Sequence, residues 1–150
     1  MKYILLTIFL LSSSYLFFKG LQNDPTYIPS NLIYKEAPHF NLETMDNNKL
    51  FSSKDLESNE IKILNFFASW CPPCKIEHPQ LTKLSEKYKV YGIAKKDEKK
   101  KLIKWLDDLG NPFQNIGLDN DGMTSINWGV YGLPETFFIN KEGMIIYKHI

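Results

Sequence analysis

Two cysteines, Cys71 and Cys74, lie three positions apart in this chain, and the residues around them constrain the fold more than any other feature of the sequence. Before them, residues 61–67 (Ile-Lys-Ile-Leu-Asn-Phe-Phe) form an apolar and aromatic run that predicts a buried strand. After them, residues 73–88 predict a helix, because their apolar side chains recur at close to helical spacing. These apolar positions are Ile76, Leu81, Leu84 and Tyr88. A Cys-x-x-Cys pair between a strand and a helix is typical of a redox-active dithiol.

The predicted helix explains why this dithiol would react. Cys71 falls at the helix N-terminus, where unpaired backbone N–H groups and the helix dipole stabilise a thiolate, so we expect its pKa to lie below that of a free cysteine. Pro72 and Pro73 suit the first turn, where a missing N–H costs little. Cys74, one turn further in, is expected to be more buried and to stay protonated until needed. We therefore predict that Cys71 attacks a substrate disulfide and that Cys74 resolves the mixed disulfide.

Other interpretations of the pair stay open. A permanent structural disulfide would close a loop of only two residues and give little entropic stabilisation. Covalent haem attachment needs a histidine directly after the second cysteine, where this chain has Lys75. A metal site of Cys71, Cys74 and His78 would place soft ligands one helical turn apart, but no fourth ligand is evident. We predict no metal and no other cofactor.

The N-terminal residues are predicted to lie outside the globular domain. Residues 3–18 are almost entirely apolar and are flanked by Lys2 and Lys19. We favour an uncleaved membrane anchor over a cleaved signal peptide, because the apolar run continues beyond the small residues 12–14 that could form a cleavage site. Either interpretation exports the rest of the chain. The expected organisation is an anchor or signal over 1–20, a linker over 21–35 and one domain over 36–150.

Charge gives little indication of a partner. The net charge is +1 at pH 7, and all 18 basic residues are lysines, which gives no argument for nucleic-acid binding. The densest charged cluster, 95–101, predicts the solvated start of an amphipathic helix, with a partner-docking patch as the alternative.

Periodicity and turn residues predict the remaining elements. Strands are expected at 37–42, 90–94, 116–119, 136–140 and 144–148. A short strand and a helical turn are expected within 49–60. Helical segments are expected at 99–109 and 123–128. This order predicts an α/β fold with a mixed β-sheet flanked by helices on both faces.

The segment 129–137, Gly-Val-Tyr-Gly-Leu-Pro-Glu-Thr-Phe, is the second informative stretch. A cis Leu133–Pro134 bond would place backbone polar groups beside the dithiol, ready to pair with an extended substrate. Because X–Pro bonds are mostly trans, the argument for a cis bond comes from resemblance to a known family. With such a bond, we expect the loop to contact Cys71 and Glu135 to point toward the dithiol.

The sequence around Trp70 and the cysteines resembles thioredoxin-fold oxidoreductases. More closely, the chain is similar to the membrane-anchored thiol:disulfide interchange proteins of cytochrome c maturation (CcmG/DsbE type), over about residues 28–148. The stretches that carry this resemblance are 28–33, 37–40, 64–71, 77–79 and 129–137. Trp-Cys-x-x-Cys is shared by many families, whereas Gly-Val-Tyr-Gly-x-Pro-Glu-Thr is much more specific. The resemblance implies a thioredoxin-like fold with an N-terminal transmembrane anchor.

The resemblance also implies a function. It implies a reductant on the periplasmic side of the bacterial inner membrane, held there by one span. Its substrate would be the Cys-x-x-Cys-His thiols of apocytochrome c or a thiol carrier of the haem-attachment machinery, and a membrane electron donor would re-reduce its disulfide. The catalytic residues would be Cys71 and Cys74. Supporting residues of the site would be Trp70, Pro72, Pro73, Glu77, Leu133, Pro134 and Glu135.

The chain departs from the thioredoxin pattern at Asn65, six positions before the first cysteine, where ordinary thioredoxins have a buried acid. Asn65 cannot accept a proton, so proton handling for Cys74 would come from Glu77 or Glu135. An ordinary surface or strand-edge carboxylate is an equally good interpretation of each. The family usually continues into a C-terminal helix, whereas this sequence ends at Ile150.

Two other functions stay open. One is a general exported thiol reductase that serves other substrates, such as the cysteines of copper or cofactor sites. The other is a metal-binding assembly factor on a thioredoxin-like fold, which would want a wider cysteine spacing and a distant histidine. His39 and His149 are available, but one lies on a predicted edge strand and the other next to the end of the sequence.

Overall fold

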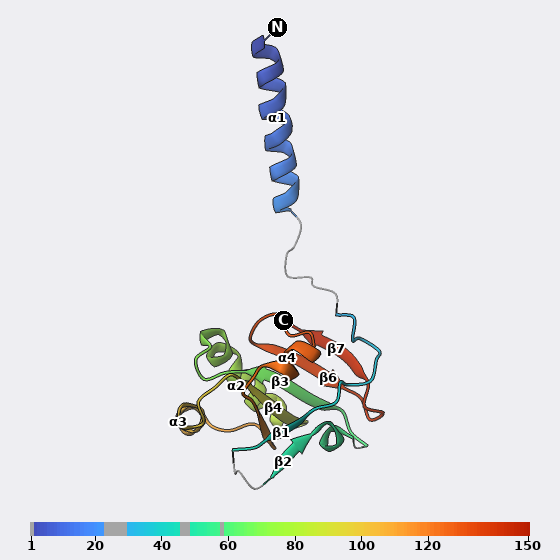
Figure 1. Cartoon of the computed structure of the whole chain (residues 1–150), viewed down its shortest axis with the longest axis vertical. Coiled ribbons are helices and arrows are strands. Elements are labelled where there is room, and N and C mark those ends of the chain that lie inside the picture. Colours follow the sequence, from blue (N-terminus) through green and yellow to red (C-terminus); the bar gives the residue numbers. More distant parts are fainter. Residues whose placement is uncertain (1, 23–29, 46–48, 58) are drawn as a thin grey trace.

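The computed structural model describes residues 2–22, 30–45, 49–57 and 59–150, and it is built on a five-stranded sheet of order β5–β4–β3–β6–β7 (Figure 1). The central strand β3 pairs parallel with β4 and antiparallel with β6. The outer strand β5 is parallel to β4, and β7 is antiparallel to β6, so the predicted mixed sheet is confirmed. The strand bounds are β3 Lys62–Phe67, β4 Lys89–Lys95, β5 Ile116–Asp119, β6 Glu135–Ile139 and β7 Ile145–His149.

Each face of the sheet carries its own hydrophobic core. Helices α2 (Pro72–Ser85) and α3 (Lys99–Leu109) cover one face, and this core contains both cysteines. The other face is covered by the ribbon of β1 (Asn41–Glu43) and β2 (Leu50–Ser52), by the 3₁₀ turn η1 and by the end of α4. The bounds of the two short helical elements are Ser53–Leu56 for η1 and Met123–Asn127 for α4.

Alternation along β3 decides which face each side chain joins. All six residues of β3 are buried, as expected for a central strand. Ile63 and Phe67 belong to the core under α2 and α3, whereas Leu64 and Phe66 belong to the opposite core. Successive side chains in a strand point to opposite faces, so Asn65 lies on the α2 face. The same alternation runs through β6, the strand that follows the cis-proline segment.

The predicted order of elements is confirmed, and α3 and β5 have the predicted bounds. Three details were wrong. The early edge strand at 37–42 begins only at Asn41, Ile76 is 77% exposed, and Tyr88 lies beyond the end of α2. The buried face of α2 consists of Cys74, His78 and Leu81, at spacings of four and three, so a side chain two positions after Cys74 points to solvent.

The N-terminal helix α1 (Lys2–Leu21) has no buried residue and is long and apolar enough to cross a membrane. A signal sequence would pass the same test. Residues 30–35, assigned above to a linker, instead lie against the domain: Leu32 and Ile33 pack on the core, and the Tyr34 N–H donates to the Ile145 carbonyl at 2.7 Å. The predicted domain start at 36 is therefore several residues too late, and linker residues 23–29 lie outside the described residues.

Candidate active site

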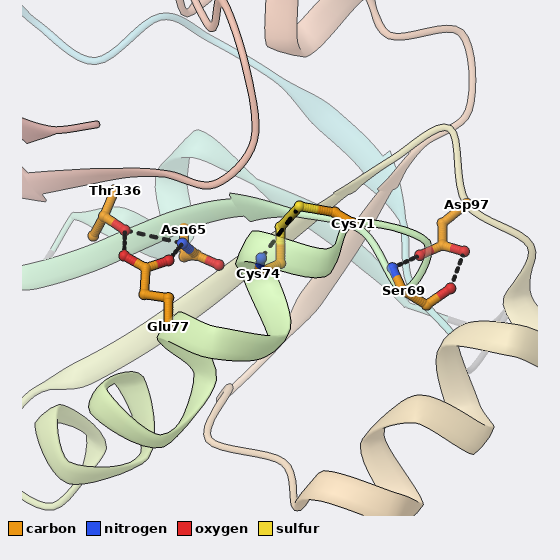
Figure 2. Close-up of a disulfide and its surroundings, with 7 residues drawn as sticks. All are labelled: Asn65, Ser69, Cys71, Cys74, Glu77, Asp97 and Thr136. Carbon is orange, nitrogen blue, oxygen red and sulfur yellow. Dashed lines mark hydrogen bonds between the residues drawn. A yellow bond between two sulfur atoms is a disulfide. The ribbon is translucent and has the colours of Figure 1, made fainter. Parts of the chain in front are cut away.

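Cys71 and Cys74 form a disulfide at the start of α2, with their Cα atoms 5.4 Å apart. Cys71 is the N-cap residue: its backbone is extended, and its Sγ accepts the N–H of Cys74 at 3.3 Å (Figure 2). Pro72 and Pro73 occupy the first turn, as predicted. The expected difference in burial is small, since Cys71 is 4% exposed and Cys74 is 2% exposed. The geometry places the first sulfur where a helix N-terminus stabilises negative charge.

After reduction, Cys71 is expected to be the more acidic thiol, because a backbone N–H and the start of α2 stabilise its thiolate. The test is the rate of alkylation across pH in two variants, Cys74→Ala and Cys71→Ala, each of which leaves one thiol. The rate should titrate below the pKa of free cysteine in Cys74→Ala and above it in Cys71→Ala. Faster labelling of Cys74 at low pH would contradict the assignment of the attacking sulfur.

The loop before Cys71 is tied to the turn that follows β4. The backbone N–H of Ser69 donates to the carboxylate of Asp97, and the Ser69 hydroxyl donates to its other oxygen at 2.7 Å (Figure 2). The indole N–H of Trp70 donates to the Lys96 carbonyl at 3.1 Å, while the Trp70 side chain stays 58% exposed. Trp70 is thus fixed by one edge and presents the remainder of its ring to solvent beside Cys71.

Sequence reasoning missed Ser69 and Asp97. The cluster 95–101 was interpreted as the solvated start of a helix or as a partner-docking patch, although α3 begins at Lys99 and Asp97 precedes it. The usable signal was the position of Asp97 just beyond the end of β4, a strand parallel to β3. The carboxyl ends of parallel strands meet at one edge of a sheet, where the Cys-x-x-Cys loop also lies.

A polar group formed by three side chains lies on the α2 face of the sheet, next to the dithiol. Asn65 donates its amide hydrogens to Glu77 at 3.2 Å and to the Thr136 hydroxyl at 2.9 Å. The Thr136 hydroxyl in turn donates to Glu77 at 3.3 Å (Figure 2). Asn65 is fully buried and Glu77 is half-buried, so Glu77 connects this group to the surface.

Glu77 also borders a cavity of about 170 Å³ between α2 and the strands β6 and β7. The cavity is lined by Glu77, Gln80, Leu81, Leu84, Thr136, Phe138, Tyr147 and His149. Because Glu77 is itself half-buried, its carboxylate can exchange a proton with solvent at this surface.

The prediction that Glu135 points toward the dithiol was wrong. Glu135 pairs across the sheet with Phe66, and alternation places it on the face opposite to α2, whereas its neighbour Thr136 faces Glu77. Its carboxylate is fully buried and forms an ion pair with Lys148 at 2.7 Å. Glu135 therefore lies on the face of the sheet opposite to the dithiol, where it is paired with Lys148.

The Leu133–Pro134 peptide bond is cis, as predicted. Leu133 packs against both cores, including the one that contains Cys71 and Cys74, so the segment before β6 reaches the dithiol side of the domain. Direct contact between Pro134 and Cys71 stays a prediction.

The metal-site alternative has no support within the described ranges, where no three His, Cys, Asp or Glu side chains are grouped to hold an ion. His78 is buried in the core instead. Its Nε2 lies 2.9 Å from the Gly110 carbonyl oxygen, and its ring packs edge-on against Trp105.

Comparison with known proteins decides the family. The model of the AhpC/TSA family matches residues 33–148. The thiol:disulfide interchange protein DsbE of Pseudomonas fluorescens biotype C is 42% identical over 146 residues, which cover 97% of this chain and 81% of that protein. The chain belongs to the AhpC/TSA family and is a thiol:disulfide interchange protein of the DsbE type. DsbE of Escherichia coli (strain K12) is 44% identical over 129 residues, 85% of this chain and 70% of that protein.

Solved structures agree with the DsbE assignment. The crystal structure of a protein described as DsbE from Chlorobium tepidum matches with a TM-score of 0.68 and 25% identity, over 77% of this chain and 82% of that one. The solution structure of a protein described as a thioredoxin, from Neisseria meningitidis, matches with a TM-score of 0.66 and 26% identity, over 76% and 78% of the two chains. The predicted thioredoxin-like fold and thiol–disulfide oxidoreductase activity are confirmed, and the activity assigns the Cys71–Cys74 disulfide to redox chemistry.

Proposed function

We propose that this DsbE-type protein is a reductant of cysteine pairs during the biogenesis of c-type cytochromes. Its substrate is the Cys-x-x-Cys-His segment of apocytochrome c, or a thiol carrier of the haem-attachment machinery. The observation that carries the proposal is the combination of an N-capping Cys71 with the Gly-Val-Tyr-Gly-Leu-Pro-Glu-Thr segment.

The reaction transfers two electrons to the substrate. The Cys71 thiolate attacks one sulfur of the substrate disulfide, the second substrate sulfur leaves as a thiolate and takes a proton, and a mixed disulfide forms. Cys74 then loses its proton and attacks the Cys71 sulfur. The remaining substrate sulfur leaves as a thiol, and the Cys71–Cys74 disulfide is the oxidised product. In this scheme Glu77 takes the proton from Cys74 and, being half-buried, returns it to solvent.

In this proposal the substrate binds to the surface around Cys71. Trp70 offers an exposed ring held at its indole nitrogen. Pro72 and Pro73 add exposed apolar surface in the first turn of α2. On the other side, Leu133 and Pro134 present backbone groups to an extended polypeptide, which is the usual way in which an unfolded segment is bound without regard to its sequence.

We propose that the protein acts at the bacterial inner membrane. Helix α1 is the single span, and the catalytic domain lies in the periplasm, where a membrane electron donor re-reduces the disulfide. Support comes from the length and apolar surface of α1 and from Lys2 and Lys19 near its ends. A reductant in an oxidising compartment needs such a donor, because each turnover leaves Cys71 and Cys74 oxidised.

The direction of electron flow is tested by the redox potential. Equilibration of the protein with glutathione buffers should give a potential nearer to the roughly −270 mV of thioredoxin than to the roughly −120 mV of a periplasmic oxidase. The Cys74→Ser variant is the control, because it cannot form the intramolecular disulfide. A potential above about −150 mV would count against reduction as the role.

A further inference from the structure

A buried ion pair lies behind the active site, on the face of the sheet opposite to the dithiol. The Lys148 ammonium on β7 is 2.7 Å from the Glu135 carboxylate on β6, and the two side chains are 3% and 0% exposed. Two charges removed so completely from water lose their hydration, and their mutual attraction offsets that loss only when further polar partners satisfy them. The identity of those partners indicates what the pair does.

Within the part of the chain that the structure describes, the further hydrogen bonds of the pair go to the cis-proline loop, residues 129–134. One oxygen of Glu135 accepts the backbone N–H of Tyr131 at 2.8 Å and that of Gly132 at 3.1 Å. The Lys148 ammonium donates to the Gly129 carbonyl at 2.8 Å. Hydrogen bonds to charged groups are roughly twice as strong as neutral ones, so the pair binds the start and the middle of the loop firmly.

The outer side of the loop is open. Tyr131 is 68% exposed, and among the described residues other than the two chain neighbours of Gly132 no atom lies within 4 Å of the point where a side chain on Gly132 would begin. The Tyr131 ring covers the Lys148 ammonium, with 5.1 Å between the nitrogen and the ring centroid. The shape of the exposed backbone therefore depends on the ion pair beneath it.

We propose that Lys148 is a positioning residue for polypeptide substrates. Acting through Glu135 and Gly129, it holds the cis-proline loop in the shape that pairs with an extended segment carrying a disulfide. The inference rests on the proposed function, because it assigns the loop to binding of a polypeptide. A small disulfide needs only the dithiol, so the contribution of Lys148 is confined to polypeptide substrates.

A purely structural role makes a different prediction. An ion pair that only supported the core would, when removed, lower the folded fraction and impair every substrate equally. A positioning role raises the KM for a polypeptide disulfide and leaves the chemistry of Cys71 unchanged. Comparison of a large and a small substrate separates the two roles.

The experiment uses the full chain, purified in detergent and reduced, with two substrates: an oxidised peptide containing Cys-x-x-Cys-His, and oxidised glutathione. Lys148→Met should raise the KM for the peptide about tenfold while changing kcat and the rate with glutathione less than about twofold. Lys148→Arg keeps the charge and should restore the KM to within about threefold of the original. Lys141→Met, an exposed lysine in the β6–β7 turn, is the control and should change nothing.

Thermal unfolding of each variant shows whether it is folded. If Lys148→Met leaves Glu135 unpaired and unfolds the chain, the double variant Glu135→Gln/Lys148→Met replaces it, because it buries no unpaired charge; its peptide KM should still rise at least about threefold. An equal loss with both substrates, or an unchanged peptide KM in a folded variant, would overturn the proposal. If the unmodified protein fails to reduce the peptide at all, the proposed function fails instead, and the two failures are distinguishable.

Discussion

Replacement of Cys71 with serine is expected to lower the rate of disulfide reduction at least about a thousandfold, because a serine hydroxyl is not ionised near neutral pH and forms no disulfide. Replacement of Cys74 with serine should have a different result. Cys71 can still attack, but serine at position 74 cannot resolve the mixed disulfide, so the peptide accumulates covalently bound to Cys71. The two cysteines are equally buried within a few per cent, and the difference between the variants follows from the position of Cys71 at the N-cap of α2.

The measurement is mass spectrometry under non-reducing conditions, after Cys74→Ser has been mixed with an oxidised Cys-x-x-Cys-His peptide. The double variant Cys71→Ser/Cys74→Ser is the control and should trap nothing. Trapping by Cys71→Ser in place of Cys74→Ser would reverse the two roles. A peptide with the histidine replaced by alanine tests the substrate class, since equal trapping of both peptides would favour a general exported reductase over one dedicated to haem-attachment segments.

The parts of this site that could be predicted from sequence are those carried by local pattern. A strand, a Cys-x-x-Cys pair and a helix are contiguous along the chain, so residues 61–88 were enough to place Cys71 at a helix N-terminus. The cis bond before Pro134 was predicted from resemblance alone, since no local rule distinguishes it from the usual trans bond.

Contacts between distant segments could not be predicted in the same way. The hydrogen bonds from Ser69 to Asp97 span 28 positions, and neither segment has a sequence pattern that predicts a contact with the other. The face that Glu135 joins depends on strand register, and a shift of one residue would have exchanged Glu135 with Thr136. The sequence limited the candidates for proton handling to two carboxylates, and only the register of β6 against β3 separates them.

Because Glu77 and Glu135 lie on opposite faces of the sheet, an experiment can show which of them accepts the proton. Glu77 follows Cys74 by three positions in α2, lies on the dithiol face, and is half-buried beside a cavity. Glu135 lies on the other face and is held by Lys148. Only Glu77 combines a place near Cys74 with a route to solvent, so it is the better candidate for accepting the Cys74 proton during resolution.

Replacement of Glu77 with glutamine is therefore expected to slow resolution of the mixed disulfide at least about tenfold. The glutamine oxygen can still accept from Asn65 and its NH2 group can donate to the Thr136 hydroxyl, but the amide cannot accept a proton. The measurement is the rate of peptide release from a preformed mixed disulfide, followed across pH. The defect should shrink at high pH, where hydroxide can deprotonate Cys74 directly. Glu135→Gln is the matched variant on the opposite face; it can weaken peptide binding, but it should leave the pH profile of release unchanged. A pH profile altered in Glu135→Gln and unaltered in Glu77→Gln would show that proton transfer follows a route through the other side of the sheet.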